Sequence, residues 1–298
     1  MENRGLEGLS DVAVELISGN ARAHISTLGA ECVAWSVSGR ELLWGRETQH
    51  WDRAAPVLFP TVGWSRDGRV QIAGRSYAMQ VHGFAANMRF KAVSHDAASA
   101  VFELADSEAT RKHFPFAFGL RVRYALEAET LRVALEVSNP GAETLPYACG
   151  LHPGFARPLS ADERSDYQIE FAEVENNEVP VITSGGLFSS ERRGVPLQGR
   201  TLALDDETFR YEALCFLNAR SKHVSLVGRH GAIRVEADGF RHWALWSRPG
   251  APFVCVEAWT GYGDPEGFIG EFADKPSMEH LAPGEVRRHE VVLRWQAR

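Results

Sequence analysis

Three short segments place residues that can move protons beside glycine, proline or aromatic neighbours. His82 lies in QVHGFAANMRF, where Gly83 lets the backbone turn tightly beside the imidazole. His152 lies in YACGLHPGF, between an apolar stretch and a Pro-Gly turn. Glu257 interrupts the apolar segment FVCVEAWTGYGD, where a carboxylate is costly unless it is paired, solvated by a cleft or used. This set suits general acid–base catalysis, because a histidine and a partly desolvated carboxylate both titrate near neutral pH.

These residues also have a structural interpretation. A lone histidine beside Gly or Pro is more often a hydrogen-bonded structural residue than a catalyst. The eight tryptophans are by default core or sheet-face residues, although an aromatic face also stacks on sugar rings, and Trp259 beside Glu257 is the candidate for that role. The four cysteines stand far apart among apolar or small residues, which is typical of small buried hydrophobes rather than of a disulfide or zinc framework.

Several function classes lack their motifs. No G-x-G-x-x-G or P-loop pattern occurs, so we expect no nucleotide cofactor. Neither G-x-S-x-G nor H-E-x-x-H is present, so a nucleophile elbow and a helical zinc site have no support in the sequence. The chain has 32 Lys+Arg against 39 Asp+Glu and no long basic run, which makes nucleic acid and anionic membranes poor partners. It has no long apolar run and no signal-peptide pattern, so we expect a cytoplasmic monomer or homodimer.

Alternation of apolar and polar residues dominates the chain and must position these groups. Residues 120–126 and 131–137 alternate on both sides of the polar turn EAET, which predicts a hairpin with one buried face. The alternation returns at 167–171, 224–226, 233–235 and in the closing VVLRW. Helical spacing is scarce, and only 106–114 and short pieces elsewhere allow a turn or two of helix. Gly and Pro punctuate the chain at hairpin distances and no linker divides it. We therefore predict an all-β fold, a large antiparallel β-sandwich, as a single domain over residues 1–298.

Five motifs follow one another along the chain: APVLFPTVG at 55–63, VHGFA at 81–85, GLHPGF at 150–155, FVCVEAW at 253–259 and LAPGE at 281–285. In this order they resemble the aldose 1-epimerases, or galactose mutarotases, and within them the LacX-like bacterial branch. The similarity runs from ISTLGAECVAWSVSGRELLWG to LAPGE, nearly the whole chain. It implies a β-supersandwich with an open sugar cleft and an isomerase that interconverts the α and β anomers of an aldose without metal or cofactor.

The resemblance also implies roles for single residues. His152 matches the general acid of the family, Glu257 its general base, and His82 a second histidine that binds the sugar. The acidic residue that binds sugar hydroxyls falls within LDDETFRYEALCF, where Glu212 matches by its place before Ala-Leu. Because the two histidines and Glu257 each lie at a predicted strand end beside a turn, we expect them to converge on one concave face.

Two positions depart from the family pattern. Trp64 stands where the family usually has an arginine after the FP-x-x-G turn, and Ala86 stands where many LacX-like members have one in H-G-F-A-R. An indole offers a flat apolar face to a sugar instead of several donors, so we expect Trp64 to bind substrate by stacking. This predicts weak activity on galactose and a preference for a less polar or differently substituted aldose.

Three rival functions stay open on the sequence alone. The first is a β-sandwich that binds sugars in the cleft but does not catalyse anomer exchange. A sugar-phosphate mutarotase would need a basic cluster at the cleft rim, for which Arg66, Arg69 and Arg89 are the candidates. A glycoside hydrolase would need a second carboxylate at about 5 to 9.5 Å from Glu257.

Overall fold

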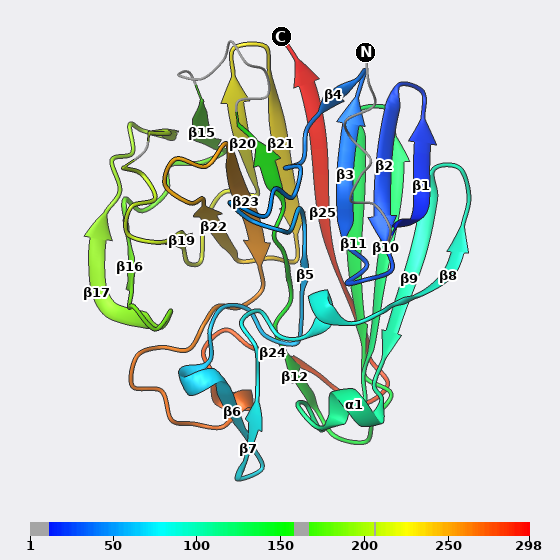
Figure 1. The fold of residues 1–298 in the computed structure, drawn as a ribbon. Coiled ribbons are helices and arrows are strands. Elements are labelled where there is room, and N and C mark those ends of the chain that lie inside the picture. The colour runs from blue at the N-terminus through cyan, green and yellow to red at the C-terminus, as the bar shows by residue number, and fades with distance from the viewer. Residues whose placement is uncertain (1–11, 158–166, 206) are drawn as a thin grey trace.

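The computed structural model describes residues 12–157, 167–205 and 207–298, and it is built almost entirely of antiparallel strands (Figure 1). The predicted all-β fold is confirmed. The one α-helix among these residues is α1 (Glu108–Arg111), inside the predicted helical segment and capped by Ser107. Short 3-10 turns occur at Arg66–Gly68, Ala85–Asn87 and Phe272–Asp274. No helix in the described part of the chain is long and apolar enough to cross a membrane.

The largest sheet has nine strands within the described residues. Its order is β18 (Thr201–Ala203), β15 (Gln168–Phe171), β20 (His223–Gly228), β21 (Gly231–Asp238), β25 (Val286–Ala297), β11 (Thr130–Ser138), β10 (Gly119–Glu127), β9 (Ser99–Ala105) and β8 (Lys91–His95). The predicted hairpin is confirmed, since β10 and β11 pair from Gly119 with Ser138 to Glu127 with Thr130. Burial alternates along β10 as the period-two pattern requires.

A second sheet positions the residues that carry chemistry. Its order is β19 (Leu214–Phe216), β22 (His242–Trp246), β23 (Phe253–Trp259), β13 (Gly150–Leu151) and β5 (Val57–Leu58), and β14 (Gly154–Ala156) also pairs with β23. Every residue of β23 is buried, so this strand is covered on both faces. That explains why FVCVEAW reads as a continuous apolar run rather than an alternating one.

Smaller sheets complete the architecture. A four-stranded sheet of β1 (Val12–Ser18), β2 (Ala21–Ser26), β3 (Cys32–Val37) and β4 (Arg40–Glu41) lies against the β9–β10 part of the large sheet (Figure 1). The hydroxyl of buried Tyr124 in β10 donates to the carbonyl of Ala30 at 2.7 Å and ties the two sheets together. Three two-stranded sheets remain among the described residues: β6 (Arg69–Ile72) with β7 (Arg75–Ala78), β12 (Leu145–Tyr147) with β24 (Glu279–Leu281), and β16 (Glu178–Ile182) with β17 (Phe188–Gly194).

One large hydrophobic cluster joins the inner faces of these sheets, with a small satellite around Trp44 and Phe253. A continuous core is what a single domain requires, and the single-domain organisation itself stays a prediction. The four cysteines are buried free thiols, as the sequence predicts.

Candidate active site

A cavity of about 710 Å³ opens over the second sheet, between β5, β23 and the loops around them. Its volume falls in the range of small-molecule sites. Its lining combines aromatic and apolar side chains with polar and charged ones. The structure brings together here all six residues that the sequence nominates: Trp64, His82, His152, Glu212, Glu257 and Trp259.

His152 and Glu257 touch at the floor of this cavity. Nε2 of His152 lies 3.2 Å from Oε1 of Glu257, and both side chains are buried. The topology explains the contact, because β13 and β14, on either side of His152, both pair with β23. Glu257 lies inside β23, two residues before its end, so its expected place at a strand end is wrong. The strand is covered there by the His152 connection, which brings the imidazole over the carboxylate.

Burial drives both groups of this pair toward their neutral forms. It raises the pKa of the Glu257 carboxyl well above its usual value, although the Trp259 indole N–H, which donates to Oε2 at 3.0 Å, opposes this. Burial also lowers the pKa of the His152 imidazole well below its usual value, and nearby His82 lowers it further. The raised pKa of Glu257 agrees with the prediction from the sequence, whereas the sequence alone predicts a pKa near neutral pH for His152. At 3.2 Å the two groups are close enough for their titrations to be coupled.

His82 is held in a strained but well-supported conformation beside this pair. Its φ is +62°, and the next residue, Gly83, has φ +79° with no room for a side chain, since a Cβ there would lie 2.2 Å from the carbonyl oxygen of Phe59. The backbone N–H of Gly63 donates to His82 Nδ1 at 3.1 Å, so the proton of the neutral ring lies on Nε2. Burial lowers the pKa of His82 to about 4. The His82 and His152 rings meet edge to face with centroids 5.4 Å apart.

Two further tryptophans enclose His152, and the sequence argument did not single them out. The ring of Trp51 lies 5.0 Å from the imidazole at 33°, and the ring of Trp246 lies 5.7 Å away at 80°. Gly154 makes room for this arrangement, because a Cβ there would lie 2.7 Å from Trp51. No local pattern distinguishes these two tryptophans from core residues, and their role follows only from the tertiary structure.

Trp64 and Glu212 lie at the outer part of the cavity. The indole of Trp64 is 48% exposed and packs against Gly186, where a Cβ would come within 2.0 Å of the ring. Glu212 is exposed and has φ +72°, and its backbone carbonyl accepts a hydrogen bond from Arg193 at 2.9 Å. Both positions allow contact with a bound sugar, and their roles stay predictions.

The basic rim that a sugar-phosphate mutarotase would need is not formed by its candidates Arg66, Arg69 and Arg89, because none of them lines the main cavity. Among the described residues, the arginines that line the main cavity are Arg53 and Arg248. After Trp64 the chain leaves the cavity through the 3-10 turn that contains Arg66 and enters the β6–β7 hairpin, which begins with Arg69. Arg89 follows this hairpin in the chain and donates to the hydroxyl of Thr27 at 3.4 Å. The substitutions at 64 and 86 therefore do not leave the cavity without guanidinium groups.

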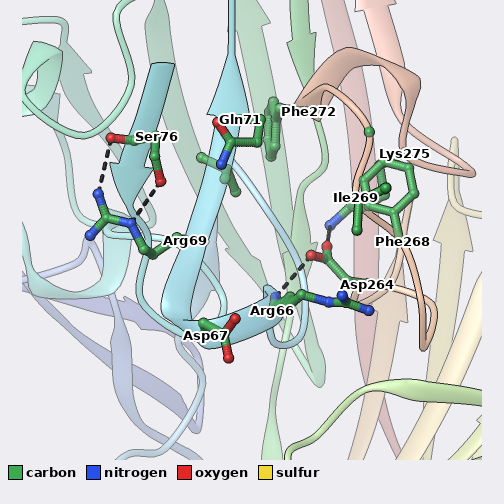
Figure 2. A pocket seen from close by; sticks show the side chains of 12 residues that line it. Arg66, Asp67, Arg69, Gln71, Ser76, Asp264, Phe268, Ile269, Phe272 and Lys275 are labelled. Carbon is green, nitrogen blue, oxygen red and sulfur yellow. Dashed lines mark hydrogen bonds and ion pairs between the residues drawn. The ribbon is translucent and has the colours of Figure 1, made fainter. Parts of the chain in front are cut away.

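Arg66 and Arg69 line a separate cavity of about 170 Å³ (Figure 2). The Nε–H of Arg69 donates a hydrogen bond to the hydroxyl of Ser76 at 2.7 Å. Deeper in the cavity, Lys275 lies 3.4 Å from Asp264 and donates to Thr61 at 2.8 Å. Figure 2 shows the carboxylate of Asp264 between Lys275 and the backbone N–H of Arg66, which donates to it at 2.9 Å. This cluster supports the wall of the main cavity from behind, because the Asp264 backbone N–H also donates to the carbonyl of Trp64.

His152, Cys255 and Glu257 place possible metal-ligand atoms within 4.8 Å of one another. The chemistry of this set suits a metal poorly. Burial raises the pKa of the Cys255 thiol well above its usual value, whereas a metal binds the thiolate. His152 Nε2 and Glu257 are, moreover, already directed at each other.

Comparisons with known proteins identify relatives along nearly the whole chain. Residues 12–294 match the sequence profile of the aldose 1-epimerase family. The plasmid-encoded protein LacX of Lactococcus lactis subsp. lactis is 29% identical over 287 residues, which cover 91% of this chain and 95% of LacX. A galactose mutarotase related enzyme from Lactobacillus acidophilus superposes with a TM-score of 0.88 at 28% identity, over 95% of this chain and 97% of that one. A galactose mutarotase-like protein from Lactobacillus casei shares the fold, with a TM-score of 0.88 at 24% identity over 96% and 99% of the two chains. The chain belongs to the aldose 1-epimerase family.

Proposed function

We propose that this protein is an aldose 1-epimerase, an isomerase that interconverts the α and β anomers of a free monosaccharide aldose in the cytoplasm. The observation that carries the proposal is the contact between His152 Nε2 and Glu257 Oε1 at 3.2 Å on the floor of a sugar-sized cleft. A carboxylate and an imidazole that share one proton provide a base and an acid a few ångströms apart. Ring opening of an aldose needs such a pair.

In the proposed reaction the two groups move one proton each. Glu257 takes the proton of the C1 hydroxyl while His152 donates a proton to the ring oxygen, so the bond from C1 to the ring oxygen breaks and the C1 carbonyl forms. Rotation about the C1–C2 bond presents the other face of the carbonyl. Reclosure reverses both transfers and yields the other anomer. Each transfer contributes about 10²- to 10⁴-fold when the groups are well placed.

The other predicted residues act on binding. His82, with its proton on Nε2, donates a hydrogen bond to the sugar next to His152. Trp259 holds Glu257 through its indole N–H, and its ring lines the cavity. Trp64 offers an exposed ring face for stacking, and Glu212 accepts hydrogen bonds from hydroxyl groups at the rim. The group that contacts Glu257 is an imidazole, which supplies the acid that ring opening of an aldose requires.

Anomer exchange tests the proposal directly. Polarimetry, or NMR exchange between anomers, over freshly dissolved aldoses and sugar phosphates should show acceleration by the protein for at least one free aldose. Binding of a sugar with no acceleration of its exchange would instead identify a non-catalytic carbohydrate-binding protein. Acceleration confined to sugar phosphates would favour the phosphate-specific rival.

The proton-sharing pair predicts a wide pH plateau for kcat/KM. Adding a second proton gives the pair a net positive charge and removing the last one gives it a net negative charge, and burial disfavours both forms. Burial lowers the pKa of His152 and raises the pKa of Glu257. The active form, in which the pair carries one proton, therefore persists over a wider pH range than it would if both groups had their ordinary pKa values. His82 stays neutral until pH falls to about 4.

The measurement is kcat/KM for the best aldose over a buffer series at constant ionic strength. We expect a plateau through neutral pH with an acid limb below 6.5, the ordinary value for histidine. A rate that rises through 6.5 as an exposed histidine titrates would contradict the assignment of a buried pair.

If the substrate stacks on Trp64, removal of the indole should weaken substrate binding and leave the rate of the chemical step unchanged. Trp64→Ala should raise KM by about 3- to 10-fold with kcat nearly unchanged, because ring stacking binds the substrate and the transition state equally. Tyr211→Ala, which truncates an exposed aromatic residue outside the cavity lining, is the matched control. A fall in kcat at constant KM would show that Trp64 acts on the chemical step instead.

A further inference from the structure

Glu31 is a buried carboxylate directly before β3, and its side chain contacts residues 53–55, of which Arg53 lines the cavity. It is 1% exposed. Its Oε1 accepts the backbone N–H groups of Ala54 at 2.6 Å and Ala55 at 3.1 Å, and its Oε2 lies 3.3 Å from Nη1 of Arg53. A buried charge of this kind is costly unless its hydrogen bonds and its ion pair are well formed. Here both conditions are met, and the result is a fixed position for residues 53–55.

Arg53 is held from two further directions and still reaches the cavity. Its Nη1 donates to the carbonyl of Ala86 at 3.1 Å, and its Nη2 donates to the side-chain oxygen of Asn87, which is itself bonded to Gln80 at 2.8 Å. The side chain is 23% exposed and lines the cavity. Its guanidinium therefore lies over the backbone of residue 86, although residue 86 itself is an alanine.

The guanidinium has donors to spare. Arginine carries five N–H groups, and the contacts to Glu31, Ala86 and Asn87 use three. The Nε–H and one Nη2 hydrogen have no acceptor among the described residues. Because Glu31 neutralises the charge of Arg53, these donors suit neutral hydroxyl oxygens better than an anion. Arg248 contrasts with this, since its side chain is exposed and has no ion-pair partner in the described parts of the chain.

We infer that Arg53 is a specificity-determining residue that donates to two neighbouring hydroxyl groups of a neutral aldose, and that Glu31 is the positioning residue that holds it there. The inference rests on the proposed function and deepens it. The rigid fork of a guanidinium matches a pair of adjacent acceptors, which a single ammonium or amide group does not. A site built in this way rejects a sugar that lacks either hydroxyl, because the donors are then left unpaired.

Arg53→Met tests the donor role, since it keeps the apolar stem and removes the N–H groups. Charge-assisted hydrogen bonds predict a fall in kcat/KM of about 10- to 100-fold, expressed mainly in KM, with partial recovery in Arg53→Lys. In a series of aldoses that each lack one hydroxyl, we expect the wild type to have a low kcat/KM for two of them, those that lack either of two neighbouring hydroxyls. Arg53→Met should lose this discrimination. Arg123→Met is the matched control, because Arg123 also pairs with a glutamate, Glu136, but outside the cavity.

The outcomes separate this inference from the proposed function. If Glu257→Gln stops exchange while Arg53→Met leaves KM and the deoxy-sugar discrimination unchanged, the inference is overturned and the function stands. If the protein accelerates no exchange, calorimetric titration of the same sugars into wild type and Arg53→Met decides the matter through affinity. Equal affinities, or no binding of any sugar by the wild type, would overturn it in that case.

The positioning role of Glu31 has its own readout. Glu31→Gln keeps an acceptor for the backbone N–H groups and removes the charge that holds Arg53. We expect a rise in KM with kcat unchanged, and a double variant Glu31→Gln/Arg53→Met that is no worse than Arg53→Met alone. Additive losses in kcat/KM would overturn the positioning role. Thermal unfolding of each variant shows whether the protein still folds. If Glu31→Gln does not fold, Arg53→Lys, which leaves Glu31 in place, is used in its stead.

Discussion

Replacement of Glu257 with glutamine should slow anomer exchange by about 10²-fold or more while sugar affinity changes only a few-fold. Glutamine keeps the shape of the side chain and an oxygen for the Trp259 indole N–H, which donates to Oε2 at 3.0 Å. It cannot take the proton of the C1 hydroxyl. The loss should appear in kcat, because the carboxylate contributes chiefly in the transition state. Exchange spectroscopy between anomers measures the rate, and titration calorimetry measures the affinity.

The companion variant is His152→Asn, for which we expect a loss of similar size. The two groups lie 3.2 Å apart and act as one acid–base pair in the proposed reaction, so the double variant should be little slower than either single one. Glu236→Gln, a glutamate on β21 that pairs with Arg234 outside the cavity, is the control for loss of a carboxylate. Unchanged exchange in either single variant would refute the roles assigned to this pair.

The sequence predicts the fold and the floor of the site well, and for the same physical reason. Strands in which one face is buried must alternate, so the 120–137 hairpin is visible in the residue pattern. A carboxylate within a fully buried strand breaks the apolar pattern at a single point, which makes Glu257 conspicuous. His152 is visible because the chain must turn between β13 and β14, and both of these strands pair with β23.

The walls of the site are less predictable, because they depend on which loops meet in three dimensions. Arg53 lines the cavity and pairs with Glu31, which lies 22 positions earlier, and no local spacing indicates that pairing. Arg66 lies two residues after Trp64 and yet faces a different cavity, because the intervening turn redirects the chain. Trp51 resembles any core tryptophan until His152 is found beside it. The pKa of His152 likewise depends on burial that the sequence does not reveal.

The buried ion pair behind the cavity wall is the place where we expect a substitution to lower the stability of the protein most. Asp264 and Lys275 are both buried, with Oδ1 and Nζ 3.4 Å apart, and burial lowers the pKa of Lys275 while Asp264 opposes that shift. The backbone of Asp264 also bonds Trp64 and Phe188, which line the cavity. The ion pair thus holds two parts of one wall together.

Lys275→Met should lower the free energy of unfolding by about 3 to 5 kcal/mol, because it leaves the Asp264 carboxylate buried without its cation. The ammonium also donates to Thr61 at 2.8 Å, and that bond is lost as well. The double variant Asp264→Asn/Lys275→Met should recover part of the loss, since no uncompensated charge then remains, although Asn must still accept the N–H of Arg66. Urea unfolding of the three proteins gives the comparison. A double variant less stable than Lys275→Met would show that the hydrogen bonds of Asp264, rather than its pairing with Lys275, hold the wall in place.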